Sequence, residues 1–389
     1  MIAVVWLVYR LTNSAFLLGL VGFISQIPTF IFSPLAGVLA DHLERRKILI
    51  ITQTLAMLQA FILAALSFSG HIAVWQIIVL STFLGTINAF DAPVRQAFVI
   101  DMVEKKEDLG NAIALSSSMF NSARLIGPSI AGIIIATFGE GICFLLNGFS
   151  FLAVILALYM MKVKHKNKPF ETSHMLKRLK EGLSYAFGFA PIRYILLLIS
   201  LFSLIGMSYV VVMPVVAREI LSGNAKTLGF LMGGAGLGAV IGTLYLAWQR
   251  TSRGLEKIIP AATIIFGVSL VIFSFSHNFW LSLFLMLCTG AGMMVQMAAS
   301  NTIIQTITDD DKRGRVMSFF TMAFMGIAPF GSLLAGALTE KIGAANTLLI
   351  NGILCIIGAL FFNAKANLIK KAMEIKAGIP RQSTQPPKL

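Results

Sequence analysis

The sequence predicts an all-α polytopic membrane protein with two six-helix bundles related by pseudo-two-fold symmetry. The chain of 389 residues is 57% hydrophobic and only 12% charged, with a mean hydropathy of +0.84. In soluble globular domains about 25% of the residues are charged. The apolar runs are long enough to cross a bilayer, and short polar breaks separate them. Because these runs are continuous and do not alternate with polar residues, a membrane β-barrel is not expected.

Eleven full membrane spans are expected, each bounded by polar breaks. The first apolar run, residues 1–9, is shorter, because nine helical residues rise only about 14 Å. We therefore expect an incomplete first helix: either the chain begins inside its first span, or an upstream segment is missing from the sequence. The full spans are expected at residues 16–40, 48–68, 72–100, 111–138, 142–161, 191–217, 227–248, 257–276, 279–306, 315–338 and 344–363, which gives twelve helices with the first.

Lysine and arginine are concentrated in every second break, which predicts the orientation of the chain. The basic breaks lie at 45–47, 105–106, 162–180, 250–257 and 312–315, whereas those at 69–71, 139–141 and 276–278 contain neither residue type. Basic residues next to membrane spans favour the cytoplasmic side, so we expect both termini in the cytoplasm. The net charge of +14 follows this pattern and forms no contiguous stripe, so nucleic-acid binding is not expected.

The longest internal break divides the chain into two halves. After a basic run, Leu176, Leu179, Leu183 and Phe187 recur at helical spacing among charged residues, which predicts an amphipathic helix at the cytoplasmic interface. The predicted domains are an N-terminal bundle at 1–161, this linker at 162–190, a C-terminal bundle at 191–363 and a cytoplasmic tail at 364–389.

The two halves repeat small residues at a constant offset. An offset of 204 residues aligns Gly132 with Gly336 and Gly139 with Gly343, and Asn147-Gly148 aligns with Asn351-Gly352 in the same way. Single matches mean little, since small residues are common in membrane helices. A run of matches without gaps over two successive spans indicates a repeat, and two parallel six-helix halves are typical of one large transporter fold.

The break between the spans at 16–40 and 48–68 carries a specific motif, Gly37-x-Leu39-Ala40-Asp41-x-x-x-Arg45-Arg46-Lys47. It resembles the signature between helices two and three of the major facilitator superfamily, and this resemblance extends over the whole chain. It departs from the signature at His42 and Glu44, where many members have a basic residue and a glycine. We hypothesise that Gly37, Asp41, Arg45, Arg46 and Arg315 form a gating latch, in which Asp41 meets the N-terminus of helix five or Arg315 and closes the cytoplasmic side.

A narrower resemblance rests on residues 88–99, 111–121 and 124–128. These stretches are similar to the branch of bacterial exporters that includes the enterobactin exporter and the macrolide efflux proteins. Gly127-Pro128-x-x-Ala131-Gly132 resembles the antiporter motif in helix five of drug exporters, with Ala131 in place of the usual glycine. We expect Gly127, Pro128 and Gly132 to form a bend that seals the outward end, and a simple packing kink is the alternative.

The resemblance implies a secondary active exporter that moves an amphipathic small organic molecule by proton antiport and alternating access. It also implies location in the bacterial inner (plasma) membrane. A siderophore-type exporter and a lysophospholipid transporter of the same fold are alternatives within this class. A membrane scaffold or sensor that transports nothing, or an inactive fragment, is the alternative outside it.

Three charged residues inside membrane spans are candidates for coupling or substrate binding. Asp91 and Arg95 are four residues apart and share a helix face, and Arg124 lies in the next span. A lone charge in a span costs about 2.5–3.5 kcal/mol, so such groups usually pair or line a wet cavity. In the functional interpretation Asp91 is a proton site paired with Arg95 or Arg124, and the arginines contact the substrate or gate. The alternative is a structural ion pair.

The sequence gives no indication of an enzyme, a metal site or a bound cofactor. It contains no GxxxxGK[ST] motif, and none of its histidine pairs has metal-ligand spacing. Gly234, Gly236 and Gly238 match a dinucleotide-binding fingerprint, but no strand precedes them, so we interpret Gly234, Gly238 and Gly242 as a close-packing helix face. The expected partners are a small-molecule substrate, protons and the lipid bilayer, and the protein is expected to be a monomer.

Overall fold

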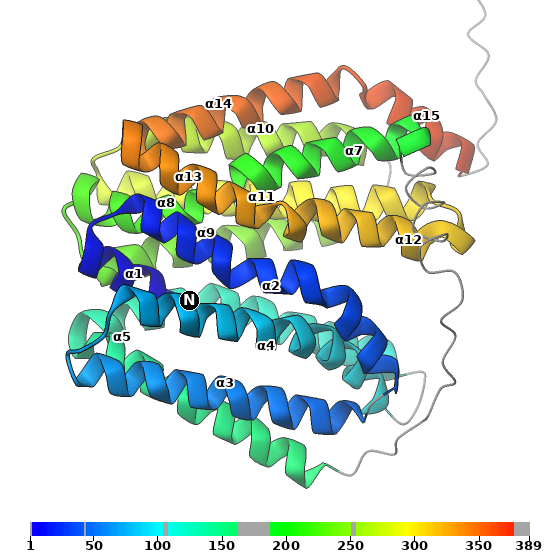
Figure 1. The fold of residues 1–389 in the computed structure, drawn as a ribbon. Helices are drawn as coiled ribbons and strands as arrows, with labels where there is room; N and C mark the ends of the chain where they lie inside the picture. The colour runs from blue at the N-terminus through cyan, green and yellow to red at the C-terminus, as the bar shows by residue number, and fades with distance from the viewer. Residues whose placement is uncertain (1, 43, 104–107, 162–186, 250–253, 377–389) are drawn as a thin grey trace, which may run out of the picture.

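The computed structural model describes residues 2–42, 44–103, 108–161, 187–249 and 254–376, and these residues form helices with short connections and no strand (Figure 1). A helix pairs its backbone N–H and C=O groups within one segment, which a chain immersed in hydrocarbon requires. The first set of helices consists of α1 (Ile2–Thr12), α2 (Ala15–His42), α3 (Arg45–Phe68), α4 (Val74–Asp101) and α5 (Leu109–Met160).

The second set of helices follows the linker, and two of its spans are composite. Short π-helical turns (η) interrupt them; such turns are rare and occur mostly as single-turn insertions in α-helices. The expected span at 191–217 consists of α7 (Ala190–Leu201), η2 (Phe202–Gly206), α8 (Tyr209–Val215) and η3 (Val216–Ile220), and the one at 315–338 of α12 (Asp310–Thr321), η4 (Met322–Gly326) and α13 (Ala328–Ile342). The other helices are α9 (Ala225–Trp248), α10 (Leu255–Ser274), α11 (Phe279–Ile307), α14 (Ala344–Asn363) and α15 (Ala366–Lys376).

Ten of the described helical segments are long and apolar enough to cross a membrane. The predicted spans at 111–138 and 142–161 are the two arms of α5, which bends at Gly139 with φ 83° and ψ 172°. Glycine adopts such a positive φ without the steric cost of a side chain. Gly343, between α13 and α14, has φ 85° and ψ 162°. The same turn therefore recurs at the position that the sequence repeat predicts.

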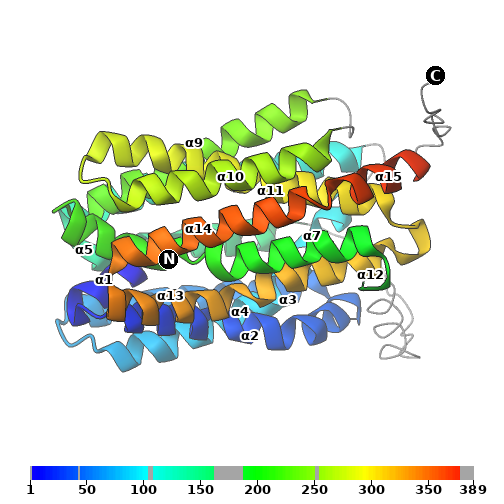
Figure 2. The same cartoon turned by 90° about the horizontal axis from the view of Figure 1, so that it is seen from above.

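The two sets of helices pack internally and meet along two seams. Within the first set α2 packs against α4 and α3 against α5, and within the second set α11 packs against α9 and α10. The seams are formed by α2 with α13 and by α5 with α9. Figures 1 and 2 both show α2 and α13 side by side. The all-α fold with two related bundles is thus confirmed.

Glycine pairs hold the two seams together. A Cβ atom built on Gly132 of α5 would lie 2.7 Å from the Cα of Gly229 on α9, and one built on Gly19 of α2 would lie 2.9 Å from the Cα of Gly336 on α13. Without side chains at these positions the backbones approach closely. Because Gly132 and Gly336 are aligned by the sequence repeat, the seams are equivalent under the pseudo-two-fold symmetry.

The bundle has two chemically different ends. We call the end that carries the α2–α3, α4–α5, α9–α10 and α11–α12 connections the basic end, and the other end the opposite end. The glycine contacts across both seams lie toward the opposite end. The proposed linker helix falls in residues 162–186, outside the described part of the chain, so the linker and the domain boundaries remain predictions.

Candidate functional site

The carboxylate of Asp91 lies in a polar cluster between α3 and α4. This residue is only 2% exposed. Its Oδ1 accepts hydrogen bonds from Thr52 Oγ1 at 2.8 Å and from Gln53 Nε2 at 2.7 Å, and both donors lie on α3. Its Oδ2 accepts a hydrogen bond from Nη2 of Arg95. Three donors therefore compensate for the removal of this carboxylate from water.

The two charged members of this cluster differ in exposure. Arg95 follows Asp91 by one turn of α4, and its side chain is 62% exposed, whereas that of Asp91 is 3% exposed. The carboxylate is thus enclosed while its counter-ion remains accessible. The predicted pairing of Asp91 with Arg95 is present, and sequence reasoning missed Thr52 and Gln53. Two adjacent polar residues inside an apolar run were the signal that could have found them.

Arg124, the third candidate, lies on α5. Its side chain is outside the described part of the structure. A contact between Arg124 and Asp91 therefore remains a prediction.

Arg45 and Arg46 connect the start of α3 to two other helices of the first set. Nη1 of Arg45 donates to both carboxylate oxygens of Asp101 at 2.9 Å, at the C-terminal end of α4. Arg46 donates from Nε to the carbonyl oxygen of Leu158 and from Nη2 to that of Tyr159, each at 2.7 Å. The last carbonyls of a helix lack intrahelical donors, and cations near that terminus are favourable. These arginines thus hold α3, α4 and α5 together at the basic end.

The remaining members of the predicted gating latch cannot be placed. The side chains of Asp41 and Arg315, and the surroundings of Gly37, lie outside the described part of the structure. The latch contact of Asp41 therefore remains a hypothesis.

Two of the three residues of the antiporter-like motif contribute to a seam: a Cβ atom built on Gly229 of α9 would lie 2.8 Å from the Cα of Gly132 and 2.8 Å from the carbonyl oxygen of Pro128. A Cβ atom on Gly127 would meet no heavy atom within 4 Å, whereas one on Gly132 would collide with the backbone of α9. Pro128 lies inside α5, and the non-helical backbone in that helix is at Gly139. The motif thus lies where α5 approaches α9 closely, and its expected role as a bend that seals the outward end remains a prediction.

The glycines of α9 form the close-packing face that their spacing predicts. Cβ atoms on Gly234, Gly238 and Gly242 would each collide with α11. The dinucleotide-binding interpretation has no structural basis at these helical residues.

A polar cluster at the opposite end joins the two sets of helices. The hydroxyl of Tyr9 donates to Oε1 of Glu219, and Nη1 of Arg218 donates to Oδ1 of Asn13 at 2.8 Å. The guanidinium of Arg218 also lies over the ring of Tyr9, 5.7 Å from its centroid. These contacts connect α1 and the residue after it to η3, and so join the first set of helices to the second.

A second contact at the opposite end connects α13 to the start of α2. Oε2 of Glu340 accepts hydrogen bonds from the Ser14 hydroxyl at 3.2 Å and from the backbone N–H of Phe16 at 3.1 Å. A carboxylate at a helix N-terminus is favourable. The sequence analysis of the polar breaks considered only lysine and arginine. The acidic residues Glu219 and Glu340 lie beside Arg218 and Lys341 in two of the breaks, and they were the signal for these contacts that it missed.

Comparison with known proteins identifies the family. The sequence profile of the family described as transmembrane secretion effector, of the major facilitator superfamily, matches residues 1–389. The chain belongs to this family. It is 28% identical to the staphyloferrin A transporter of Staphylococcus aureus (strain NCTC 8325 / PS 47) over 367 residues, which cover 93% of this chain and 91% of that protein. It is 24% identical to the multidrug efflux pump Tap of Mycolicibacterium fortuitum, with 90% and 87% covered.

Among solved structures, the fold is similar to that of the nucleoside transporter NupG (D323A mutant). The TM-score is 0.73 at 12% identity, with 93% of this chain and 94% of that chain covered.

Family membership confirms the class of function that the sequence predicts. Proteins of the major facilitator superfamily are transporters and not enzymes, and efflux proteins are among the relatives. The chain is a multi-pass bacterial membrane protein and a secondary active transporter of the efflux type for a small-molecule substrate.

Proposed function

We propose that this transporter exports an amphipathic small organic molecule by proton antiport, with Asp91 as the group that carries the proton. The observation that supports this proposal is a carboxylate, 2% exposed, inside a membrane helix and beside an accessible cation. Ionisable groups inside membrane spans are costly and are mostly retained for function.

Proton antiport requires that Asp91 holds a proton in one state of the cycle and releases it in the other. Thr52 and Gln53 are buried, but the Arg95 side chain is 62% exposed and can change its partner. In antiport the proton and the substrate are bound in alternation, so we propose that Arg95 leaves Asp91 while the substrate is absent and that Asp91 holds its proton in that state. Binding of the substrate then returns Arg95 to Asp91 and releases the proton.

Alternating access is proposed to open and close the two ends of the bundle in turn. We propose that the close contacts of the glycine seams close the opposite end in one state, and that Gly37, Asp41 and Arg315 close the basic end in the other state. In this proposal Arg45 and Arg46 hold the part of the latch that belongs to the first set of helices, because they bind the C-terminal ends of α4 and α5. We further propose a monomer in the plasma membrane, with both termini and the basic end in the cytoplasm.

The test uses purified protein in liposomes with an imposed pH gradient and a fluorescent cationic dye as the transported probe. We expect wild-type protein to drive dye movement and counter-movement of protons, and Asp91→Asn to abolish both. Glu256→Gln is the matched control, since Glu256 is a buried acid of the second set, 5% exposed, and it should retain transport. Transport by Asp91→Asn that still follows the pH gradient would contradict the assignment of Asp91.

A siderophore-type substrate is the second candidate. It is favoured by the 28% identity to a protein named staphyloferrin A transporter. The same liposomes loaded with a carboxylate siderophore distinguish the candidates, because only a siderophore exporter would move it in preference to the dye. If the dye, the siderophore and a lysophospholipid all fail to move in any gradient, the proposed substrate class is wrong.

A further inference from the structure

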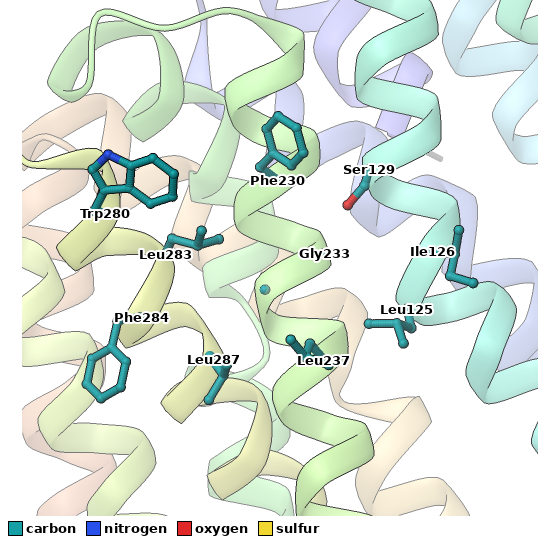
Figure 3. Close-up of a pocket in the computed structure, with 11 residues that line it drawn as sticks. Leu125, Ile126, Ser129, Phe230, Gly233, Leu237, Trp280, Leu283, Phe284 and Leu287 are labelled. Atoms are coloured by element: carbon teal, nitrogen blue, oxygen red, sulfur yellow. The ribbon is translucent and has the colours of Figure 1, made fainter.

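An apolar groove of about 500 Å³ runs along the outer side of the α5–α9 seam (Figure 3). The figure shows side chains from α5, α9 and α11 facing it. Three of them are large and open to the surroundings: Trp280, Phe284 and Ile126 are 74%, 60% and 51% exposed. The groove is lined by Leu125, Ile126, Ser129, Phe230, Gly233, Gly234, Leu237, Trp280, Leu283, Phe284 and Leu287.

The pseudo-two-fold symmetry explains why this groove exists. Gly19 of α2 and Gly229 of α9 occupy equivalent positions, because each meets the partner glycine of its own seam. Four residues later α2 has Phe23, whereas α9 has Gly233. The side chain that fills the space beside the α2–α13 seam is thus missing beside the α5–α9 seam.

The helix on the other side of each seam shows the same difference: α13 has a larger side chain than α5 at the equivalent position. Six residues before Gly336, α13 has Phe330, whereas α5 has Ile126 six residues before Gly132. Phe23 and Phe330 pack edge to face, with ring centroids 5.4 Å apart. One seam is therefore filled by an aromatic pair, and the other leaves an open groove.

A positive charge lies at one end of the groove. Lys226, in the first turn of α9, places Nζ 5.8 Å from the ring centroid of Phe230, which lines the groove. Trp280, in the first turn of α11, lies at the same end of the bundle, because α9 and α11 both begin there. An apolar trough with a lysine and a tryptophan at the membrane interface matches a lipid with an acyl chain and an anionic headgroup.

We propose that this groove binds one acyl chain of an anionic phospholipid of the bilayer, with the headgroup phosphate at Lys226. The site is separate from the Asp91 cluster and does not depend on the proposed proton antiport. Bound lipid there would fill the one seam that lacks its own aromatic pair.

The experiment uses full-length protein in lipid nanodiscs and two single-tryptophan variants. One keeps Trp280, and the other keeps Trp75, with phenylalanine at the remaining tryptophan positions. Trp75 is the matched control, because it occupies the second position of α4 as Trp280 does in α11 and is 65% exposed. Fluorescence quenching is measured with a small fraction of phosphatidylglycerol brominated on its acyl chains, in unlabelled phosphatidylcholine.

We expect Trp280 to be quenched as if brominated phosphatidylglycerol were enriched about fivefold over its mole fraction, because one lysine near the surface favours an anionic lipid by about that factor. Quenching of Trp75 should match the mole fraction of brominated phosphatidylglycerol in the nanodisc, without enrichment. Brominated phosphatidylcholine should show no such enrichment. Equal quenching of the two tryptophans would overturn the proposal.

Two variants test the parts of the site separately. Lys226→Gln should remove the preference for phosphatidylglycerol at Trp280, and an unchanged preference would refute the headgroup assignment. Ile126→Phe with Leu237→Phe should fill the groove and bring Trp280 quenching to the Trp75 level. The side chains of Ile126 and Leu237 are 51% and 43% exposed, and each substitution replaces one apolar side chain with another. If the enhanced quenching of Trp280 persists in this variant, the groove is not the site that binds the acyl chain.

Discussion

Gly132 of α5 and Gly229 of α9 are in backbone contact across a seam between the two sets of helices. A Cβ atom on Gly132 would lie 2.7 Å from the Cα of Gly229, and one on Gly229 would lie 2.8 Å from the Cα of Gly132. Real Cβ atoms do not approach other atoms this closely, so any larger residue must separate the helices.

The first prediction is that Gly132→Ala opens the opposite end of the bundle. Overpacking at a close contact costs about 1–3 kcal/mol, and this cost falls only on the state in which the seam is closed. Double electron–electron resonance between spin labels at Ser69 and His277, both in loops of the opposite end, should show a larger fraction of long distances. Gly127→Ala in the same helix is the control, since its added Cβ meets no heavy atom within 4 Å. Equal distance distributions in both variants would contradict the prediction.

The sequence predicts this fold well because its two strongest signals are physical and local. The length of an apolar run is set by the thickness of the bilayer. The sequence repeat aligns Gly132 with Gly336 and Gly139 with Gly343 from the residues alone. Run length also separates the two arms of α5, because the non-helical backbone at Gly139 lies between the spans expected at 111–138 and 142–161. The π-helical turns η2, η3 and η4 inside two other spans could not be predicted from run length.

The site was predicted only in part, because helical spacing reports neighbours within one helix. It placed Asp91 and Arg95 on one face of α4. It could not identify Thr52 and Gln53, since their contact depends on how α3 is rotated against α4. Contacts between distant parts of the chain, such as Tyr9 with Glu219, were missed for the same reason.

The second prediction concerns the energetic coupling of Asp91 and Arg95. Arg95→Gln leaves a buried carboxylate with neutral donors only, whereas Asp91→Asn leaves an arginine that is 62% exposed and can be solvated. Arg95→Gln should therefore destabilise the protein more. A double-mutant cycle from thermal unfolding in detergent should give a coupling of about 1–2 kcal/mol, reduced by the exposure of Arg95. A coupling of zero would show that the pair contributes nothing to stability.

The third prediction distinguishes two neighbouring basic residues. Arg46→Gln should destabilise the protein by about 1.5–3 kcal/mol, because it removes two hydrogen bonds from a charged donor to the last carbonyls of α5. Lys47→Gln should change stability by less than about 0.5 kcal/mol, because Lys47 is exposed and pairs with Glu44 of the same segment. Melting temperatures of the two variants test this, and similar values would show that Arg46 does not hold α3 to α5.

The fourth prediction is that Glu340 stabilises closure of the opposite end from across the seam. Its carboxylate binds the Ser14 hydroxyl and the Phe16 N–H at the start of α2. Because α13 and α2 belong to different sets of helices, this contact exists only while their ends lie together. Glu340→Gln keeps the shape of the side chain but removes the charge that favours a helix N-terminus, which is worth roughly 1 kcal/mol where exposed.

The loss should shift the balance between the two states toward opening of the opposite end by about fivefold, since about 1 kcal/mol corresponds to that factor. Spin-label distances between Ser69 and His277 measure this shift, and high salt should reproduce part of it in the wild-type protein by screening the charge. Lys341→Gln is the control, because it changes an exposed charge at the adjacent position of α13. If both variants shift the distances equally, net charge at this end controls closure and the specific contact of Glu340 with α2 does not.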